Sequence, residues 1–211
     1  MPEVWVWRLS GGDSMSLKDR IRIKEEKVLS GNWATLKTTT LEFRRNDGTW
    51  QEQKRETYDR GHGATILLYN QAKRTVILIR QFRYTAFVTG HDDLLIETPA
   101  GKLDDLSPEE CIRAESEQET GYRVRSPRKI FDVYMSPGSV TERVHFFVAE
   151  YEASDRVSAG GGHENEGEDI ETLEVTIDDA LAMVADGRIM DGKTIMLLQY
   201  AALHVFVRNG K

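Results

Sequence analysis

Two glutamates, Glu115 and Glu119, have the type and spacing in this chain that most directly suggest chemistry. They are four positions apart, so on a helix both carboxylates lie on one face about one turn apart. Like charges at this spacing repel each other, and a hard divalent cation bound through oxygen would stabilise them. Spacing alone leaves a second interpretation open, in which both side chains belong to a solvated acidic helix face.

Other side chains that often carry catalysis form no recognisable pattern. The five histidines show neither metal-ligand spacing nor a serine partner in a nucleophile elbow; they are His62, His91, His145, His163 and His204. His145 falls in an apolar stretch and is expected to be buried. The single cysteine, Cys111, is expected to face the core, and it permits neither an internal disulfide nor a cysteine-rich zinc site.

The composition limits the class of protein. The chain has 211 residues, 39% hydrophobic and 30% charged, so we expect one packed core and no transmembrane segment. Its net charge of −7 argues against general binding to nucleic acid or to a membrane, so a phosphate ligand would need a local group of cations. The first residues carry no secretory signal, which favours a cytoplasmic location, and Met1 and Met15 are both possible starts.

Local signals place the two glutamates on a helix. The stretch 107–110 supplies an N-cap serine, a proline at the first helical position and a capping-box glutamate. Gly121 is typical of the residue at which a helix ends. The sequence therefore predicts a helix up to Thr120, preceded by a tight turn at 98–101 that follows a short apolar run.

Alternating apolar runs and turn signals predict the elements that surround this helix. Strands are expected at 33–43, 49–58, 64–69, 75–82, 94–97, 129–134, 143–151 and 170–175. The first two read as an amino-terminal hairpin. Two closing helices are expected at about 177–186 and, after a cap-like Asp191, at about 192–208. The polar, glycine-rich stretch 154–169 is expected to be a mobile loop.

The segment 101–122 resembles the Nudix box, a loop–helix signature rich in glutamate. Glu115, Glu119 and Gly121 match that signature. Three other positions depart from it, because Ser107, Ala114 and Gln118 stand where the box has Glu, Arg and Glu. The segment is also one residue shorter.

The resemblance extends well beyond the box, from about Trp33 to about Tyr200, and it is to the bacterial GDP-mannose pyrophosphatases of the Nudix superfamily. The stretches that carry it are 58–61, 63–70, 76–83, 134–138, 140–142, 145–147, 159–162 and 191–194. That family shortens the box by the same residue. It also has a Ser-Pro-Gly motif beyond the box, as ADP-ribose pyrophosphatases do.

This resemblance implies an α/β fold, the Nudix α/β/α sandwich with a mixed β-sheet and an N-terminal β-hairpin arm. Residues 1–16 would be a flexible segment, 17–60 the arm and 61–211 the Nudix hydrolase domain. In related enzymes the arm exchanges between two protomers, so a homodimer is expected.

The family's site residues can be carried over by position. The implied metal ligands are the carbonyl of Ala100 and the carboxylates of Glu115, Glu119 and Glu168, and the three glutamates are also the implied catalytic residues. Because the loop is longer here, Glu164 and Glu166 are alternatives to Glu168. The implied substrate contacts are Trp33, Lys54, Arg55, Glu56, Arg83, Ala100, Gly101, Lys102, Glu142 and Lys193. Several of these also have ordinary interpretations, such as a strand-end arginine paired with a surface acid.

The implied activity is Mg²⁺-dependent hydrolysis of the pyrophosphate bond of a nucleoside diphosphate sugar, with Mn²⁺ as a possible replacement. The first candidate reaction converts GDP-mannose to GMP and mannose 1-phosphate. Trp33 stands where the family has a tyrosine that meets the base, so the base preference is open. One alternative is an ADP-ribose pyrophosphatase, and another is a non-catalytic Nudix module that senses a nucleotide.

Overall fold

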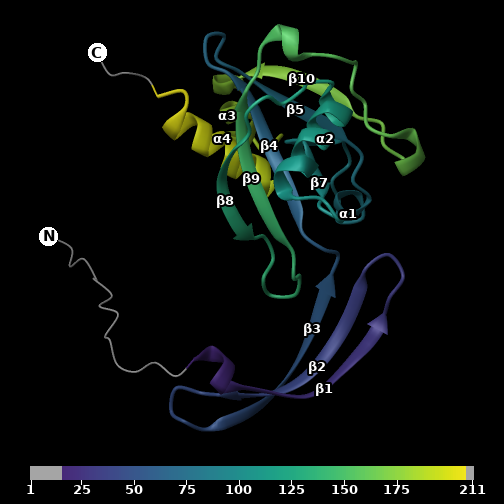
Figure 1. Ribbon diagram of the computed structural model, residues 1–211, viewed down its shortest axis with the longest axis vertical. Coiled ribbons are helices and arrows are strands. Elements are labelled where there is room, and N and C mark those ends of the chain that lie inside the picture. The colour runs from purple at the N-terminus through teal and green to yellow at the C-terminus, as the bar shows by residue number, and fades with distance from the viewer. Residues whose placement is uncertain (1–15, 208–211) are drawn as a thin grey trace, which may run out of the picture. The chain divides into compact units, whose positions relative to one another are not determined.

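The structure is a computed structural model that describes residues 16–207, so residues 1–15, with both alternative starts and nearly all of the expected flexible segment, lie outside the described residues. The described chain divides into two units, an arm of residues 16–60 and a larger unit of residues 61–207 (Figure 1). The larger unit contains the candidate catalytic residues Glu115 and Glu119, and we call it the catalytic unit. Each unit is described separately.

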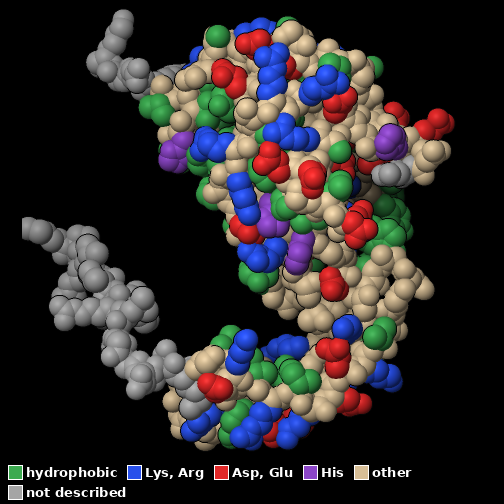
Figure 2. All heavy atoms as spheres, in the orientation of Figure 1, with side chains coloured by type: hydrophobic (Ala, Val, Ile, Leu, Met, Phe, Trp, Pro, Cys, Tyr) green, Lys and Arg blue, Asp and Glu red, His purple; other side chains and the backbone are tan. Residues whose placement is uncertain are grey.

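The arm is an antiparallel sheet in the order β1-β2-β3, preceded by a 3₁₀ turn at Leu17–Arg20. Its strands are β1 (Ile21–Ser30), β2 (Thr35–Arg44) and β3 (Trp50–Asp59). The hairpin expected from the sequence corresponds to β2 and β3, whereas β1 was not expected. Lysine, arginine and glutamate fill half of β1, and charged side chains are frequent on the surface of the arm (Figure 2). An exposed edge strand such as β1 needs no apolar alternation.

The arm has no interior of its own, since no residue between 16 and 60 is buried. The strand register places Ile21 opposite Phe43 and Ile23 opposite Leu41. These four side chains share one face of the sheet, which we call the apolar arm face. Ile23 is 60% exposed.

The catalytic unit is built on a mixed sheet in the order β10-β5-β4-β9-β8, with β6 paired to β5 and β7 paired to β4. The strands are β4 (Gly63–Asn70), β5 (Thr75–Gln81), β6 (Leu95–Glu97), β7 (Ala100–Lys102), β8 (Arg128–Tyr134), β9 (Arg143–Glu150) and β10 (Glu171–Thr176). Strands β4 and β9 run parallel and the other pairs antiparallel, so the expected mixed sheet is confirmed.

Helices cover both faces of this sheet (Figure 1). They are α1 (Tyr84–Phe87), α2 (Pro108–Thr120), α3 (Ile177–Ala185) and α4 (Gly192–His204). Side chains of β4 alternate between the two faces: Ile66 packs in a cluster with Ile112 of α2, and Leu67 packs in a cluster with Leu197 of α4. This arrangement is the expected α/β/α sandwich. Helix α4 ends at His204, earlier than the sequence predicted.

The start and end of α2 follow the local signals read from the sequence. The hydroxyl of Ser107 accepts a hydrogen bond from the Glu110 N–H at 3.3 Å, and the Glu110 carboxylate accepts one from the Ser107 N–H at 3.0 Å. Gly121 ends the helix in the left-handed conformation, with φ +78°. The predicted helix is therefore confirmed at both ends.

The glycine-rich stretch after β9 is joined to the end of α2. The N–H groups of Val157, Gly161 and Gly162 donate to the carbonyls of Gly121, Glu119 and Gln118 at 2.8, 3.0 and 3.1 Å. A Cβ on Gly160 would lie 2.6 Å from the Glu119 carbonyl oxygen, so this approach requires glycine. The stretch that we expected to be mobile thus begins with an anchored segment. No helix among the described residues has the length and apolarity to span a membrane.

Candidate active site

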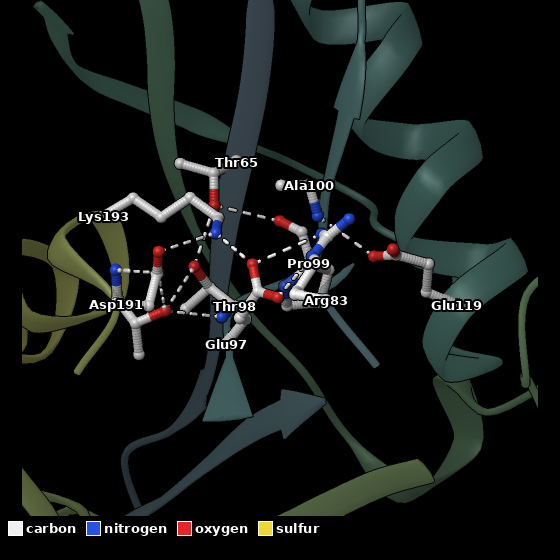
Figure 3. Close-up of polar contacts among 10 residues, drawn as sticks. Thr65, Arg83, Glu97, Thr98, Pro99, Ala100, Glu119, Asp191 and Lys193 are labelled. Atoms are coloured by element: carbon white, nitrogen blue, oxygen red, sulfur yellow. Dashed lines mark hydrogen bonds and ion pairs between the residues drawn. The ribbon is translucent and has the colours of Figure 1, made fainter. Parts of the chain in front are cut away.

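The two predicted carboxylates of α2 point at strand β7. Glu119 is 1% exposed, and its Oε2 accepts a hydrogen bond of 3.0 Å from the N–H of Ala100 (Figure 3). Glu115 fills the space beside Gly101, where an added Cβ would lie 1.8 Å from Glu115 Oε1. A helix and a short strand therefore hold the two carboxylates against the same three residues of backbone.

Glu119 is a buried carboxylate with other negative charges near it. Burial raises its pKa well above the usual value, the negative charges of Glu115 and Glu168 raise it further, and the Ala100 N–H and Arg83 act in the opposite direction. A buried carboxylate in this position is stabilised by a proton or by a cation.

These residues fit a divalent cation. Carboxylate and carbonyl oxygens are the ligands that Mg²⁺ prefers, and Mg²⁺ commonly keeps several waters when only one or two carboxylates bind it. Among the described side chains, which do not include that of Glu166, no three acidic, histidine or cysteine side chains form a preassembled metal cluster. A bound ion would therefore be coordinated mainly by the carboxylates of Glu115 and Glu119. The Ala100 carbonyl and a loop carboxylate would be its further protein ligands.

Glu168 is the loop acid whose charge reaches Glu119. Its Oε2 accepts a hydrogen bond of 2.9 Å from the His163 N–H, and a Cβ on Gly162 would lie 2.4 Å from that oxygen. The alternative Glu164 begins a short 3₁₀ turn and is exposed. The side chain of Glu166 is not among the described ones.

Two of the predicted substrate contacts, Arg83 and Lys193, meet at a third residue that the sequence analysis missed. Glu97 is 2% exposed and ends β6. Its carboxylate accepts hydrogen bonds from Arg83 Nε at 2.6 Å and Arg83 Nη2 at 3.3 Å, and another from Lys193 Nζ (Figure 3). Lys193 also pairs with Asp191 at 3.0 Å. A single acid at the end of an apolar run was the only signal in the sequence.

The charges of this cluster balance one another. Burial acts to raise the pKa of Glu97, but the Lys193 ammonium and the Arg83 hydrogen bonds outweigh it and hold that pKa below its usual value. The same pairing raises the pKa of Arg83 against the opposing effect of burial. Two cations therefore face two carboxylates, Glu97 and Asp191.

A buried chain of hydroxyl contacts fixes α4 to the turn between β6 and β7. The Thr98 N–H donates to Thr194 Oγ1 at 2.7 Å, and Asp191 caps α4 by accepting from the Thr194 N–H at 2.9 Å. On the other side of the turn, Thr65 Oγ1 donates to the Pro99 carbonyl at 3.0 Å (Figure 3). The turn thus carries Glu97 at one end and Ala100 at the other.

Two further predicted contacts lie at the same edge of the catalytic unit. Lys102 pairs with Asp104 at 3.3 Å. It also lies opposite Gly63 in the sheet, and a Cβ on Gly63 would be 3.6 Å from Glu142 Oε1. The structure therefore brings Lys102 and Glu142 to one end of β4.

The remaining predicted contacts belong to the arm. Trp33 is 71% exposed, with the Arg60 guanidinium 5.7 Å from the centre of its ring. Lys54 and Glu56 share one face of β3, and Arg55 lies on the other, where it donates to Gln53 at 2.9 Å.

Comparison with known proteins gives a consistent family assignment. The family described as NUDIX domain matches residues 59–197, and the family described as GDP-mannose pyrophosphatase NudK N-terminal domain matches residues 20–58. The chain is 55% identical over 191 residues to a GDP-mannose pyrophosphatase of Pectobacterium atrosepticum, which covers 90% of this chain and 98% of that protein. It is 54% identical over 181 residues to a GDP-mannose pyrophosphatase of Klebsiella pneumoniae, covering 85% and 90%.

The crystal structure of an ADP compounds hydrolase has a similar fold. It superposes with a TM-score of 0.68 at 17% identity and covers 92% of this chain and 100% of its own. This likeness supports the α/β/α architecture.

Proposed function

This chain belongs to the Nudix family of pyrophosphohydrolases, and we propose that it hydrolyses the pyrophosphate bond of a nucleoside diphosphate sugar, with GDP-mannose giving GMP and mannose 1-phosphate. Two comparisons support this substrate class: the arm matches the N-terminal domain family of a GDP-mannose pyrophosphatase, and relatives called GDP-mannose pyrophosphatase match both the arm and the catalytic unit. The observation that carries the proposal is the placement of Glu115 and Glu119 against β7. Only the short turn between β6 and β7 separates this strand from Glu97, which binds Arg83 and Lys193.

As a Nudix enzyme, the protein depends on a divalent metal ion, and we propose Mg²⁺ with Mn²⁺ as a substitute. Glu115, Glu119 and the Ala100 carbonyl would hold it. The ion, when bound, would neutralise phosphoryl oxygens and activate water near them.

The chain's own residues then supply orientation and proton transfer. The Ala100 N–H fixes one oxygen of the Glu119 carboxylate, so that the other oxygen is available for the ion. Arg83 and Lys193 would donate to the diphosphate oxygens. Glu168 would accept the proton of the attacking water, whose oxygen forms a bond to one phosphorus while the bond from that phosphorus to the bridging oxygen breaks. The bridging oxygen leaves with the second phosphate.

The arm would complete the site from a second protomer. Its apolar face has no interior to cover it within residues 16–60, which supports assembly with another copy of the chain. Trp33 of this arm would stack on the base. Lys54, Arg55 and Glu56 of the same arm would contact the substrate.

A product assay tests the function directly. The purified protein with Mg²⁺ is incubated with a panel of sugar nucleotides and with ADP-ribose, and the products are separated by chromatography. GDP-mannose should give GMP and mannose 1-phosphate in equal amounts and with the highest kcat/KM of the panel. Faster hydrolysis of ADP-ribose, or no hydrolysis at all, would contradict the proposal.

A further inference from the structure

The buried carboxylate of Glu97 is not among the residues implied for metal binding or for substrate contact. It is 2% exposed and lies between the guanidinium of Arg83 and the ammonium of Lys193 (Figure 3). Burying a carboxylate is costly unless it is paired and hydrogen-bonded. The two cations satisfy it, and it in turn fixes where both cations lie.

Each cation keeps hydrogen-bond donors after binding Glu97. Arg83 uses Nε and Nη2, and its Nη1 makes no hydrogen bond to any of the described side chains or backbone groups. Its side chain is 39% exposed. Lys193 donates to Glu97 and forms an ion pair with Asp191 at 3.0 Å, which leaves at least one of its three ammonium protons for another acceptor. The remaining donors on both residues are therefore held in fixed positions and can reach a bound anion.

The backbone connects this cluster to the metal carboxylates. Three residues after Glu97, the Ala100 N–H binds Glu119. The turn between them is fixed on α4 through Thr98 and Thr194, which are both fully buried. Arg83 also acts electrostatically on Glu119. One rigid segment thus sets the distance between the cations and the carboxylates.

We propose that Glu97 is a positioning residue for phosphate recognition, which holds Arg83 and Lys193 side by side so that their remaining donors converge on the same diphosphate. The inference rests on the proposed function, since it takes a diphosphate as the anion. Glu97 itself touches neither the substrate nor the metal.

The first test is Glu97→Gln, which keeps the size of the side chain and removes its charge. Without that charge the two cations repel each other and separate, so kcat/KM should fall about 10²-fold, mainly through kcat. The matched control is Asp155→Asn, since Asp155 is 5% exposed and pairs with Arg125 at 2.6 Å away from this cluster. That variant removes the charge of a buried carboxylate that pairs with a cation, as Glu97→Gln does, and it should keep near wild-type kinetics. Wild-type kinetics in Glu97→Gln would overturn the inference.

A double-mutant cycle separates positioning from general stabilisation. Because Glu97 acts through Arg83 as well as through Lys193, Glu97→Gln should lower kcat/KM less in an Arg83→Gln background than in the wild type, so the losses of the two single variants should not multiply. Losses that multiply would show that Glu97 acts independently of Arg83, and would overturn the inference.

Two further measurements cover the remaining outcomes. If Glu97→Gln does not fold, Glu97→Asp serves instead, because it keeps the charge and draws the carboxylate back by one methylene. This variant should lower kcat/KM about tenfold at an unchanged melting temperature. Full activity would overturn the inference.

Calorimetric titration with inorganic pyrophosphate in EDTA should show about tenfold weaker binding to Glu97→Gln, and equal binding would also overturn the inference. This titration needs no turnover, so a wild-type protein that hydrolyses no sugar nucleotide would contradict the proposed function alone.

Discussion

Glu115 occupies the position that a side chain on Gly101 would take, with Oε1 only 1.8 Å from where a Cβ would be. The absence of a side chain at position 101 is therefore a condition for the position of the Glu115 carboxylate. The close approach explains why a glycine directly follows Ala100 in β7, independently of any turn requirement.

Gly101→Ala should consequently lower activity with little loss of stability. The added methyl group displaces the flexible end of Glu115, which can move into solvent, and a displacement on this scale costs about 10²-fold in kcat/KM. The control is Gly138→Ala, because a Cβ there meets nothing within 4 Å. Steady-state kinetics and thermal melting measure both effects, and an active Gly101→Ala would contradict the assigned position of Glu115.

Glu119→Gln should reduce kcat by about 10²–10⁴-fold while it slightly stabilises the metal-free protein. The amide removes like-charge repulsion with Glu115, worth about 0.2–0.5 kcal/mol. Glu117→Gln is the control on the same helix, since Glu117 pairs with Arg123 at 3.1 Å. Near wild-type turnover by Glu119→Gln with Mg²⁺ would show that the assigned metal site is wrong.

The loop acids should differ in their effect on catalysis. Glu168→Gln should lower kcat by about 10²–10⁴-fold if this carboxylate accepts the proton of the attacking water. Glu164→Gln should change kcat little, because Glu164 is exposed, and Glu166→Gln completes the series. Equal, small effects at all three positions would exclude a catalytic base on this loop.

The stability of the protein should decrease as pH falls below the usual histidine pKa, because of His145. Burial lowers the pKa of His145, with Asp132 opposing and Lys129, Arg143 and His62 adding to the shift. The unfolded chain then binds a proton that the folded chain does not, so the free energy of unfolding falls as pH drops through about 6.5. Urea unfolding between about pH 7 and pH 5.5 should show a smaller decrease for His145→Gln. The exposed His204→Gln should behave as wild type, and a wild-type slope in His145→Gln would contradict the assignment.

The apolar arm face should hold two protomers together. Ile23→Lys places a charge in this contact and should shift the protein from dimer to monomer in analytical ultracentrifugation. Thr40→Lys puts the same charge on the opposite face of the sheet and should leave the dimer intact. A stable, fully active wild-type monomer would rule out the exchanged arm.

Local signals made the core of this fold predictable from the sequence. The ends of α2 follow from Ser107, Pro108, Glu110 and Gly121, which are all close to the helix in the chain. The three residues of β7 were not predicted as a strand, because β7 forms only by pairing with β4. Strand β1 was missed because its exposed position places no demand for apolar residues.

The same distinction explains the site. Glu115 and Glu119 are four residues apart, so their shared direction is local information. The role of Glu97 depends on Arg83, 14 residues away, and on Lys193, 96 residues away. No pattern of residue types or spacing records that meeting, which arises only when β5, β6 and α4 pack together.

The anchoring of the glycine-rich stretch to α2 has a consequence for loop length. The chain is fixed at Gly161 and Gly162 on one side, and on the other the Ile170 N–H binds the Gly161 carbonyl at 3.1 Å. The two ends of the loop between Gly162 and Ile170 are thus held together by this hydrogen bond. Residues can therefore be added to the loop or removed from it without changing the distance between α2 and β10. Insertions in this loop would then change how far the loop acid extends toward the site without moving the rest of the site. Relatives with different loop lengths would keep the same positions of the two α2 carboxylates.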